Sequence, residues 1–210
     1  MAGERRSLPT RSLDFPPLMT NRLLRLPLLT AVALLATLTF VACGGSKQPT
    51  THSEGEGAYV QAGPLIYQVQ MSRELNPANV EDIEYLEGLP TSTPRLAGDE
   101  EWFGVWVRVQ NDTDATHQSA SDFKIVDTTG TEYEPIQLPA NNPFAYQATP
   151  VSNDGFVPVS PDPDSAAGSG PINGEMLLFK LRTDVYANRP LELEITPPDG
   201  GEPSSVMLDL

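Results

Sequence analysis

Carboxylates are the most numerous side chains in this sequence that could do chemistry. The 210 residues include 28 Asp and Glu against 13 Lys and Arg. Two acidic pairs occur at alternate positions, Asp112 with Asp114 after a strand-like run and Asp162 with Asp164 in a proline-rich stretch. Calcium takes about six to eight oxygen ligands, and loop carboxylates spaced in this way can supply several of them. These four residues are therefore candidates for a weak calcium site. The alternative is solvated charge that keeps the protein soluble, because no segment matches an EF-hand loop.

The groups that most often perform catalysis or hold transition metals are scarce. The single cysteine excludes an internal disulfide and a multi-thiolate metal site. The two histidines, His52 and His117, have no partner at metal-ligand spacing. No serine lies in a Gly-x-Ser-x-Gly elbow, and no pair of carboxylates is singled out for glycoside hydrolysis. We therefore expect a protein that is not an enzyme, with no catalytic residues and no cofactor.

Two tryptophans are the strongest candidates for ligand binding. Trp102 and Trp106 lie on one face of a predicted strand, opposite the Phe103, Val105, Val107 and Val109 face. If the valine face meets the core, the indoles lie outside it. Exposed tryptophan is enriched at binding hot spots, so one interpretation is an open aromatic groove for a peptide, glycan or partner protein. The other is that the 75–95 segment or the long proline-rich loop covers the indoles and forms a second small core.

The N-terminal segment has the features of an export signal. Arg22 and Arg25 precede an apolar run over 26–41, and Ala42, Cys43 and small residues follow. This arrangement resembles the lipobox of bacterial lipoproteins, with Phe40 in place of the usual Leu. The resemblance implies that residues 1–42 are removed and that Cys43 carries acyl chains such as palmitate. The protein would then be lipid-anchored at the extracytoplasmic face of the cell membrane.

Other interpretations of the N-terminus stay open. The apolar run of 16 residues is shorter than the roughly 20 that span a bilayer as a helix, which counts against an uncleaved anchor. Soluble secretion is a further alternative, and Arg5-Arg6 lies too far upstream to favour a twin-arginine signal. Met19 begins a compact signal of its own and is an alternative start.

The mature chain would be strongly acidic. Removal of residues 1–42 leaves 8 basic and 26 acidic residues, a net charge of −18. Such a surface is repelled by anionic lipid head groups, so the lipid must hold the protein at the membrane. The same charge argues against nucleic acid as a partner. Residues 43–57, rich in Gly, Ser and Thr, are expected to form a flexible tether behind the lipidated cysteine.

From residue 58 onward the hydrophobic pattern has period two, which is typical of half-buried strands. Such runs occur around 67–71, 102–109, 123–125, 133–136, 177–181, 191–195 and 206–210. About seven strands with one apolar face each favour an all-β, antiparallel, immunoglobulin-like sandwich over 58–210, with a barrel as the alternative. Asn76 and Pro77 predict the start of one short helix that ends near Gly88. Seven prolines over 139–173 predict a long loop, whose aromatic residues indicate that it packs against the domain.

The landmarks of this region resemble a known group of proteins. They are FGVWVRVQN over 103–111, DFKIVDTTGTEY over 122–133 and GEMLLF over 174–179. Together they are similar to an immunoglobulin-like domain of unknown function found in bacterial lipoproteins, sometimes labelled telomeric-repeat-binding-factor-type. The resemblance implies a sandwich outside the cytoplasm and assigns no functional residues.

These observations favour a lipid-anchored, extracytoplasmic, non-enzymatic binding or accessory domain of the bacterial cell envelope. Its partner would be a protein or an envelope ligand. Two alternatives stay open: a structural or chaperone-like partner of an envelope membrane protein, and a calcium- or solute-binding lipoprotein.

Overall fold

The computed structural model describes residues 50–158 and 173–208. Cys43, Asp162 and Asp164 lie outside this range, as do the predicted signal segment and the first part of the predicted tether. Among the described residues, no helix is both long enough and apolar enough to cross a bilayer.

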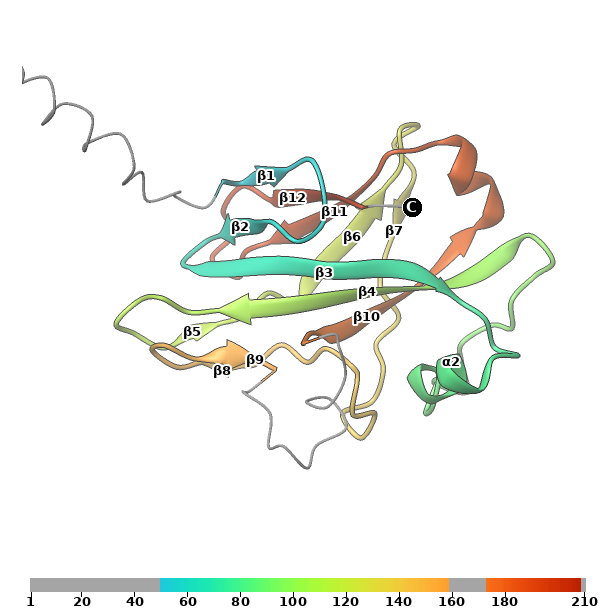
Figure 1. The fold of residues 1–210 in the computed structure, drawn as a ribbon, viewed down its shortest axis with the longest axis horizontal. Coiled ribbons are helices and arrows are strands. Elements are labelled where there is room, and N and C mark those ends of the chain that lie inside the picture. Colours follow the sequence, from blue (N-terminus) through green and yellow to red (C-terminus); the bar gives the residue numbers. More distant parts are fainter. Residues whose placement is uncertain (1–49, 159–172, 209–210) are drawn as a thin grey trace, which may run out of the picture. The chain divides into compact units, whose positions relative to one another are not determined.

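Two antiparallel sheets face each other across one core (Figure 1). The first sheet has the order β10-β4-β3-β2, and a short strand, β9, also pairs with β4. Its members are β2 (Tyr59–Ala62), β3 (Leu65–Leu75), β4 (Glu100–Gln110), β9 (Phe156–Val157) and β10 (Glu175–Arg182).

The second sheet has the order β1-β12-β11-β6-β7. Its members are β1 (His52–Ser53), β6 (Asp122–Val126), β7 (Glu132–Tyr133), β11 (Leu191–Thr196) and β12 (Ser204–Leu208). Only the β1–β12 pairing is parallel among the strand pairs of these two sheets. The pairings β3-β4-β10 and β6-β11-β12 reproduce the A-B-E and C-F-G groupings of immunoglobulin domains. The predicted fold class, an antiparallel immunoglobulin-like sandwich, is therefore confirmed.

The main core lies between the inner faces of the two sheets. It takes every second residue of each long strand, as the period-two pattern predicts. Phe103 and Phe179 face each other directly across the β4–β10 pair, and Leu193 and Ile125 do so across β11 and β6. Two short elements complete the description. One is the two-stranded antiparallel pair of β5 (His117–Gln118) with β8 (Pro150–Val151), and the other is the 3-10 helix η3 (Thr183–Ala187).

The described part of the predicted proline-rich loop packs against the domain, as expected. Tyr146, Val151 and Val157 are buried in the main core. β8 and β9 also arise within this stretch, which the prolines gave no reason to expect.

The predicted tether needs a correction. Residues 50–57 belong to the folded domain, because β1 pairs with β12 and Thr50 bridges to Val60. His52 also contacts Ser205 and Glu192 through Nδ1, at 2.8 and 3.3 Å. The folded domain therefore begins by residue 50 and not at 58.

Candidate functional site

The two tryptophans are covered and do not line an open groove. Trp102 and Trp106 are 6% and 2% exposed and pack with Leu75, Leu138 and Met176 in a second hydrophobic cluster. Residues from the 75–96 segment and from 136–145 complete this cluster. The structure therefore agrees with the interpretation in which the indoles are covered and form a second small core, and not with an open aromatic groove. A ligand-binding role for these indoles would require the covering segments to move.

The covering segment contains the helix α2 (Val80–Tyr85), which lies near the point where β3 ends and β4 begins (Figure 1). Its cap is Asn79, whose side chain accepts from the backbone N–H of Glu81 at 3.0 Å. The prediction that Asn76 caps the helix was wrong. The Asn76 side chain instead accepts a hydrogen bond from Ala78 N at 2.9 Å and forms a turn before the helix. The helix therefore begins about one turn later than predicted.

An ion pair between buried Asp82 and partly exposed Arg73 holds α2 on the sheet. Asp82 is buried, and its carboxylate accepts from Arg73 Nη2 at 2.6 Å and from Asn76 N at 2.8 Å. The hydrogen bond from Arg73 lowers the pKa of Asp82 and keeps this carboxylate ionised. The Arg73 guanidinium also lies over the rings of Tyr85 and Trp106, 5.8 and 5.5 Å from their centres.

Aromatic and amide side chains seal the other side of α2. The Tyr85 ring meets Trp106 and Phe144 edge-on, with centroids 5.2 and 4.7 Å apart. Asn142 Nδ2 donates to the carbonyls of Tyr85 and Glu87, which are orphan acceptors at the helix end. Two segments far apart in sequence therefore close over the indoles together.

The other half of this outer sheet face is partly exposed. Tyr59 pairs with Gln68, which pairs with Arg108, so these three side chains form a row across β2, β3 and β4. In the next row Ile66 pairs with Gln110, which pairs with Phe156 of β9. Adjacent strands lie about 4.8 Å apart, so each row spans roughly 10–15 Å. We call this surface the glutamine face; it comprises Tyr59, Gln61, Ile66, Gln68, Gln70, Arg108, Gln110 and Phe156.

None of the eight residues of the glutamine face carries a carboxylate, although Asp112 lies beside it and accepts a hydrogen bond from Gln110 Nε2. Hydrogen bonds and a ring contact pre-position several of its side chains. Gln68 Nε2 donates to the carbonyl of Gly57 at 2.7 Å, and Gln70 Nε2 donates to Gln68 Oε1 at 3.3 Å. The Arg108 guanidinium lies 4.6 Å from the centre of the Phe156 ring. No ion pair of Arg108 with a carboxylate occurs within the described residues. Tyr59 is 49% exposed.

Sequence reasoning missed this surface because each of its residues looks like an ordinary solvent-facing strand position. The signal that could have found it is compositional. In a chain with 28 acidic residues, the eight residues of this surface include none, although Glu74 and Glu100 lie farther along β3 and β4.

The predicted calcium ligands do not form a site among the described residues. Asp112 and Asp114 are exposed in the loop after β4, and no cluster of three or more metal-ligating side chains occurs in the part of the chain that the structure describes. Asp112 instead accepts a hydrogen bond from Gln110 Nε2. Asp162 and Asp164 lie outside the described residues, so the four-carboxylate site stays a prediction.

Asn111 organises this loop. Its buried amide donates to the carbonyls of Ala115, Val151 and Ser152 at 2.7, 2.8 and 3.0 Å. Its Oδ1 accepts from the Thr113 backbone and hydroxyl. The loop that carries both aspartates is therefore built around a polar anchor with no open ligand positions on it.

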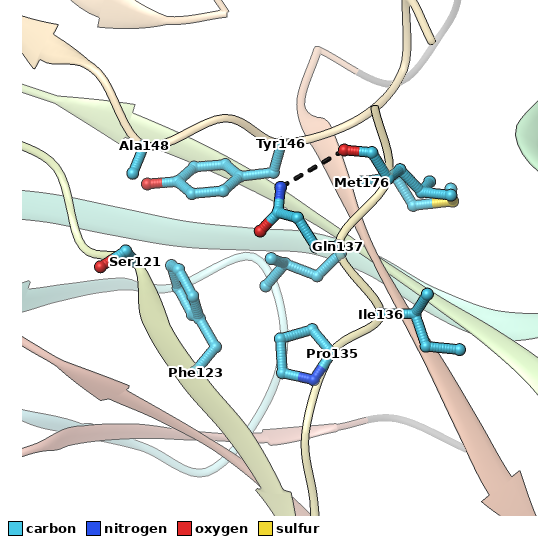
Figure 2. Close-up of a pocket in the computed structure, with 10 residues that line it drawn as sticks. Ser121, Phe123, Pro135, Ile136, Gln137, Tyr146, Ala148 and Met176 are labelled. Atoms are coloured by element: carbon cyan, nitrogen blue, oxygen red, sulfur yellow. Dashed lines mark hydrogen bonds between the residues drawn. The ribbon is translucent and has the colours of Figure 1, made fainter. Parts of the chain in front are cut away.

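A small cavity lies between the edges of the two sheets (Figure 2). Its volume of about 40 Å³ suits a few water molecules, since one water needs roughly 10–15 Å³. Tyr146, which lines it, donates through its hydroxyl to the carbonyl of Ala120, and Ala120 N donates to Tyr67 Oη, both at 2.8 Å. Burial raises the pKa of Tyr67 to about 12 and raises that of Tyr146 as well, so both phenols stay protonated. The cavity has room for a few water molecules and is too small for a metabolite.

Glu101 is a buried carboxyl on the inner side of β4, where it lies opposite Leu181 of β10. It is 7% exposed, and its Oε1 has no hydrogen-bond partner among the described residues. Burial raises the pKa of this carboxyl; a hydrogen bond from Tyr186 works in the opposite direction, and the nearby Glu74 charge adds to the rise. Glu101 is therefore a buried carboxyl with one unpartnered oxygen at the end of the core, directly before Trp102 in the sequence but on the opposite face of β4.

Comparisons with known proteins give structural likenesses only. No protein-family model matches the chain, and no curated protein matches it in sequence. Among solved structures, the yjhA protein from Bacillus subtilis has a TM-score of 0.48 at 10% identity, over 74% of this chain and 99% of that one. The Bacillus subtilis "putative lipoprotein (ycdA)" has a TM-score of 0.44 at 16% identity, over 72% of this chain and 38% of its own length. An uncharacterized beta-sandwich protein from Clostridium difficile has a TM-score of 0.39 at 9% identity, over 79% of this chain and 99% of that one. None of these likenesses names a ligand or an activity.

Proposed function

We propose that this protein is a lipid-anchored, extracytoplasmic, non-enzymatic binding module of the bacterial cell envelope, which contacts its ligand through the glutamine face. The observation that carries the proposal is this surface of neutral amide side chains, with one arginine and the rings of Tyr59 and Phe156, on an otherwise acidic protein. Binding surfaces are depleted in charge and enriched in Tyr, Phe and Arg, which matches Tyr59, Phe156 and Arg108.

The chemistry of the face favours a polar, uncharged ligand. Glutamine amides and the Arg108 guanidinium supply both donors and acceptors. The rings of Tyr59 and Phe156 supply flat apolar surfaces. Glycans of the cell envelope combine dense hydroxyl groups with flat apolar ring faces, so they are the ligand class that fits best.

Anchoring rests on the lipobox-like sequence that ends at Cys43. The folded domain begins by residue 50, seven positions later. An extended chain covers at most about 3.6 Å per residue, so residue 50 stays within roughly 25 Å of an acylated Cys43. This short connection keeps the domain close to the membrane surface, where it meets ligands of the innermost envelope.

The test is equilibrium binding of soluble envelope glycan fragments to the full-length mature protein in phosphatidylcholine nanodiscs. The Tyr59→Ala and Arg108→Gln variants should each weaken binding by about tenfold, the usual scale for a hot-spot residue. The matched control is Val80→Ser, which alters another exposed residue and should bind as the parent does. Equal affinity of the parent and both face variants, or no binding to any glycan fragment, would contradict the proposal.

A further inference from the structure

We infer that the outward face of α2 is a second docking surface, which takes a positively charged, amphipathic polypeptide segment of a partner protein. This surface comprises Val80, Ile83, Glu81, Glu84 and Glu87. It lies apart from the glutamine face in sequence and on a different element, so the inference stands independently of the proposed function.

The apolar part of this surface is unusually exposed. Val80 is 77% and Ile83 is 45% exposed, and together with Tyr59 they make up the large apolar side chains exposed in the described part of the chain. Residues three apart on a helix are neighbours, so Val80 and Ile83 form one contiguous patch. The same short helix turns Asp82 and Tyr85 inward to the sheet. An inward-facing aspartate with outward-facing Val and Ile reverses the usual arrangement of a surface helix.

The helix is held rigidly in this orientation. An isolated helix of six residues would not form in water. The contacts of Asp82 with Arg73 and of Tyr85 with Trp106 and Phe144 hold it in place. A partner would therefore meet a pre-organised surface, which reduces the entropic cost of binding.

The charges around the patch determine what can occupy it. Glu84 and Glu87 each follow an apolar residue by four positions, so they lie beside Val80 and Ile83, and both are exposed with Glu81. Arg73, which lies on the inner side of the helix, is already paired with Asp82. A second copy of the chain would bring like charges together, and an anionic membrane would be repelled in the same way. A segment with Lys or Arg next to large apolar side chains complements both features.

The experiment measures binding of a fluorescent synthetic peptide, with Lys and Leu arranged as an amphipathic helix, to the full-length mature protein in phosphatidylcholine nanodiscs. Signal from empty nanodiscs is subtracted. Loss of two apolar contacts in the Val80→Ser/Ile83→Ser variant should weaken binding by about tenfold or more. The Glu84→Gln/Glu87→Gln variant should also weaken it and should reduce its dependence on salt. Circular dichroism of each variant confirms that the fold is kept.

Matched controls separate this surface from a general effect of negative charge. The Glu54→Gln/Glu202→Gln variant removes the same number of exposed charges from turns outside α2, and it should bind as the parent does. A peptide with Ser in place of Leu, and one with Glu in place of Lys, should both bind at least about tenfold more weakly. Equal binding of either peptide, equal loss in the control variant, or self-association that the Val80→Ser/Ile83→Ser variant abolishes would overturn the inference.

Discussion

Glu101 shows at the scale of one residue how burial changes chemistry. Among the neighbouring acidic residues Asp99, Glu100 and Glu101, Asp99 is exposed and Glu100 pairs with Lys180 at 2.9 Å. Glu101 alone turns into the core, where burial raises the pKa of its carboxyl above the ordinary value of 4.5. The folded state therefore keeps a proton at a pH where the unfolded chain has lost it. Because of this, the free energy of unfolding falls as the pH rises from 4.5 through the folded-state pKa.

The Glu101→Gln variant should remove this loss of stability. At pH 7 it should unfold with a free energy about 1 kcal/mol higher than that of the parent, since a neutral amide replaces a buried charge. At pH 4 the difference should shrink, because the parent carboxyl is then protonated in both states. Urea unfolding at the two pH values measures both differences, and a gain that is the same at pH 4 and pH 7 would contradict this account.

Gly104 is a second residue whose role follows from close approach. It lies on the tryptophan side of β4, and a Cβ built there would be 2.8 Å from Trp106 Cη2 and 3.1 Å from Met176 Sδ. The indole is held by Arg73 and Tyr85 and cannot move away freely. The absence of a side chain at Gly104 therefore allows Trp106 to lie flat over the strand.

The Gly104→Ala variant should be destabilised by about 1–3 kcal/mol, the usual cost of overpacking a core. This is opposite to the general effect of Ala for Gly in a strand, which is favourable. Gly98→Ala is the control, because a Cβ at Gly98 meets nothing within 4 Å. Thermal unfolding distinguishes the two, and equal midpoints for Gly104→Ala and the parent would show that the indole can relax.

At the scale of elements, the sequence pattern predicted the long strands well and the covering segments less well. Alternation locates β3, β4, β6, β10, β11 and β12 because each has one face in the main core. It cannot reveal the register shift between Val69 and Met71, which comes from a bulge. It also cannot determine which face of α2 is buried, since the deciding contact joins Asp82 to Arg73 on a separate strand.

The candidate sites were harder to predict than the fold for a related reason. Trp102 and Trp106 were correctly placed on the outer face, but only the tertiary contacts of Tyr85 and Leu138 show that they are covered. The glutamine face is formed by the register of four strands, β2, β3, β4 and β9, which cannot be predicted from the sequence of any one of them. Sequence therefore identifies which residues share a face, whereas the structure shows which part of that face is accessible.

The Arg73–Asp82 ion pair is the contact that fixes α2 as an element. The Asp82→Asn variant should lose about 1–3 kcal/mol of stability, because Arg73 then keeps its charge without a partner. Solvent around the partly exposed Arg73 keeps this loss below that of a fully buried pair. Tryptophan fluorescence should shift to longer wavelength as water reaches Trp106. Glu84→Gln on the same helix is the control and should change neither quantity, whereas an unchanged fluorescence spectrum in Asp82→Asn would mean that the aromatic contacts suffice to hold the helix.

At the scale of the whole molecule, the proposed function requires a lipid anchor at Cys43. The Cys43→Ala variant tests the anchor. It should keep residues 1–42 and carry no acyl chain, which intact-mass measurement of the membrane-extracted protein detects. A Cys43→Ala protein that is shortened and acylated like the parent would show that the anchor lies elsewhere.

The central claim is that the glutamine face is occupied when the protein is in the envelope. The single cysteine of the chain makes this directly measurable, because an acylated Cys43 cannot react with maleimide and one introduced cysteine would be the only reactive thiol. Gln61→Cys, on the exposed edge of the glutamine face, is compared with Glu202→Cys in a solvent-exposed turn. The account predicts that Gln61→Cys is protected from maleimide in the intact envelope and becomes reactive after detergent extraction, while Glu202→Cys reacts equally in both. Equal reactivity of Gln61→Cys before and after extraction would contradict it.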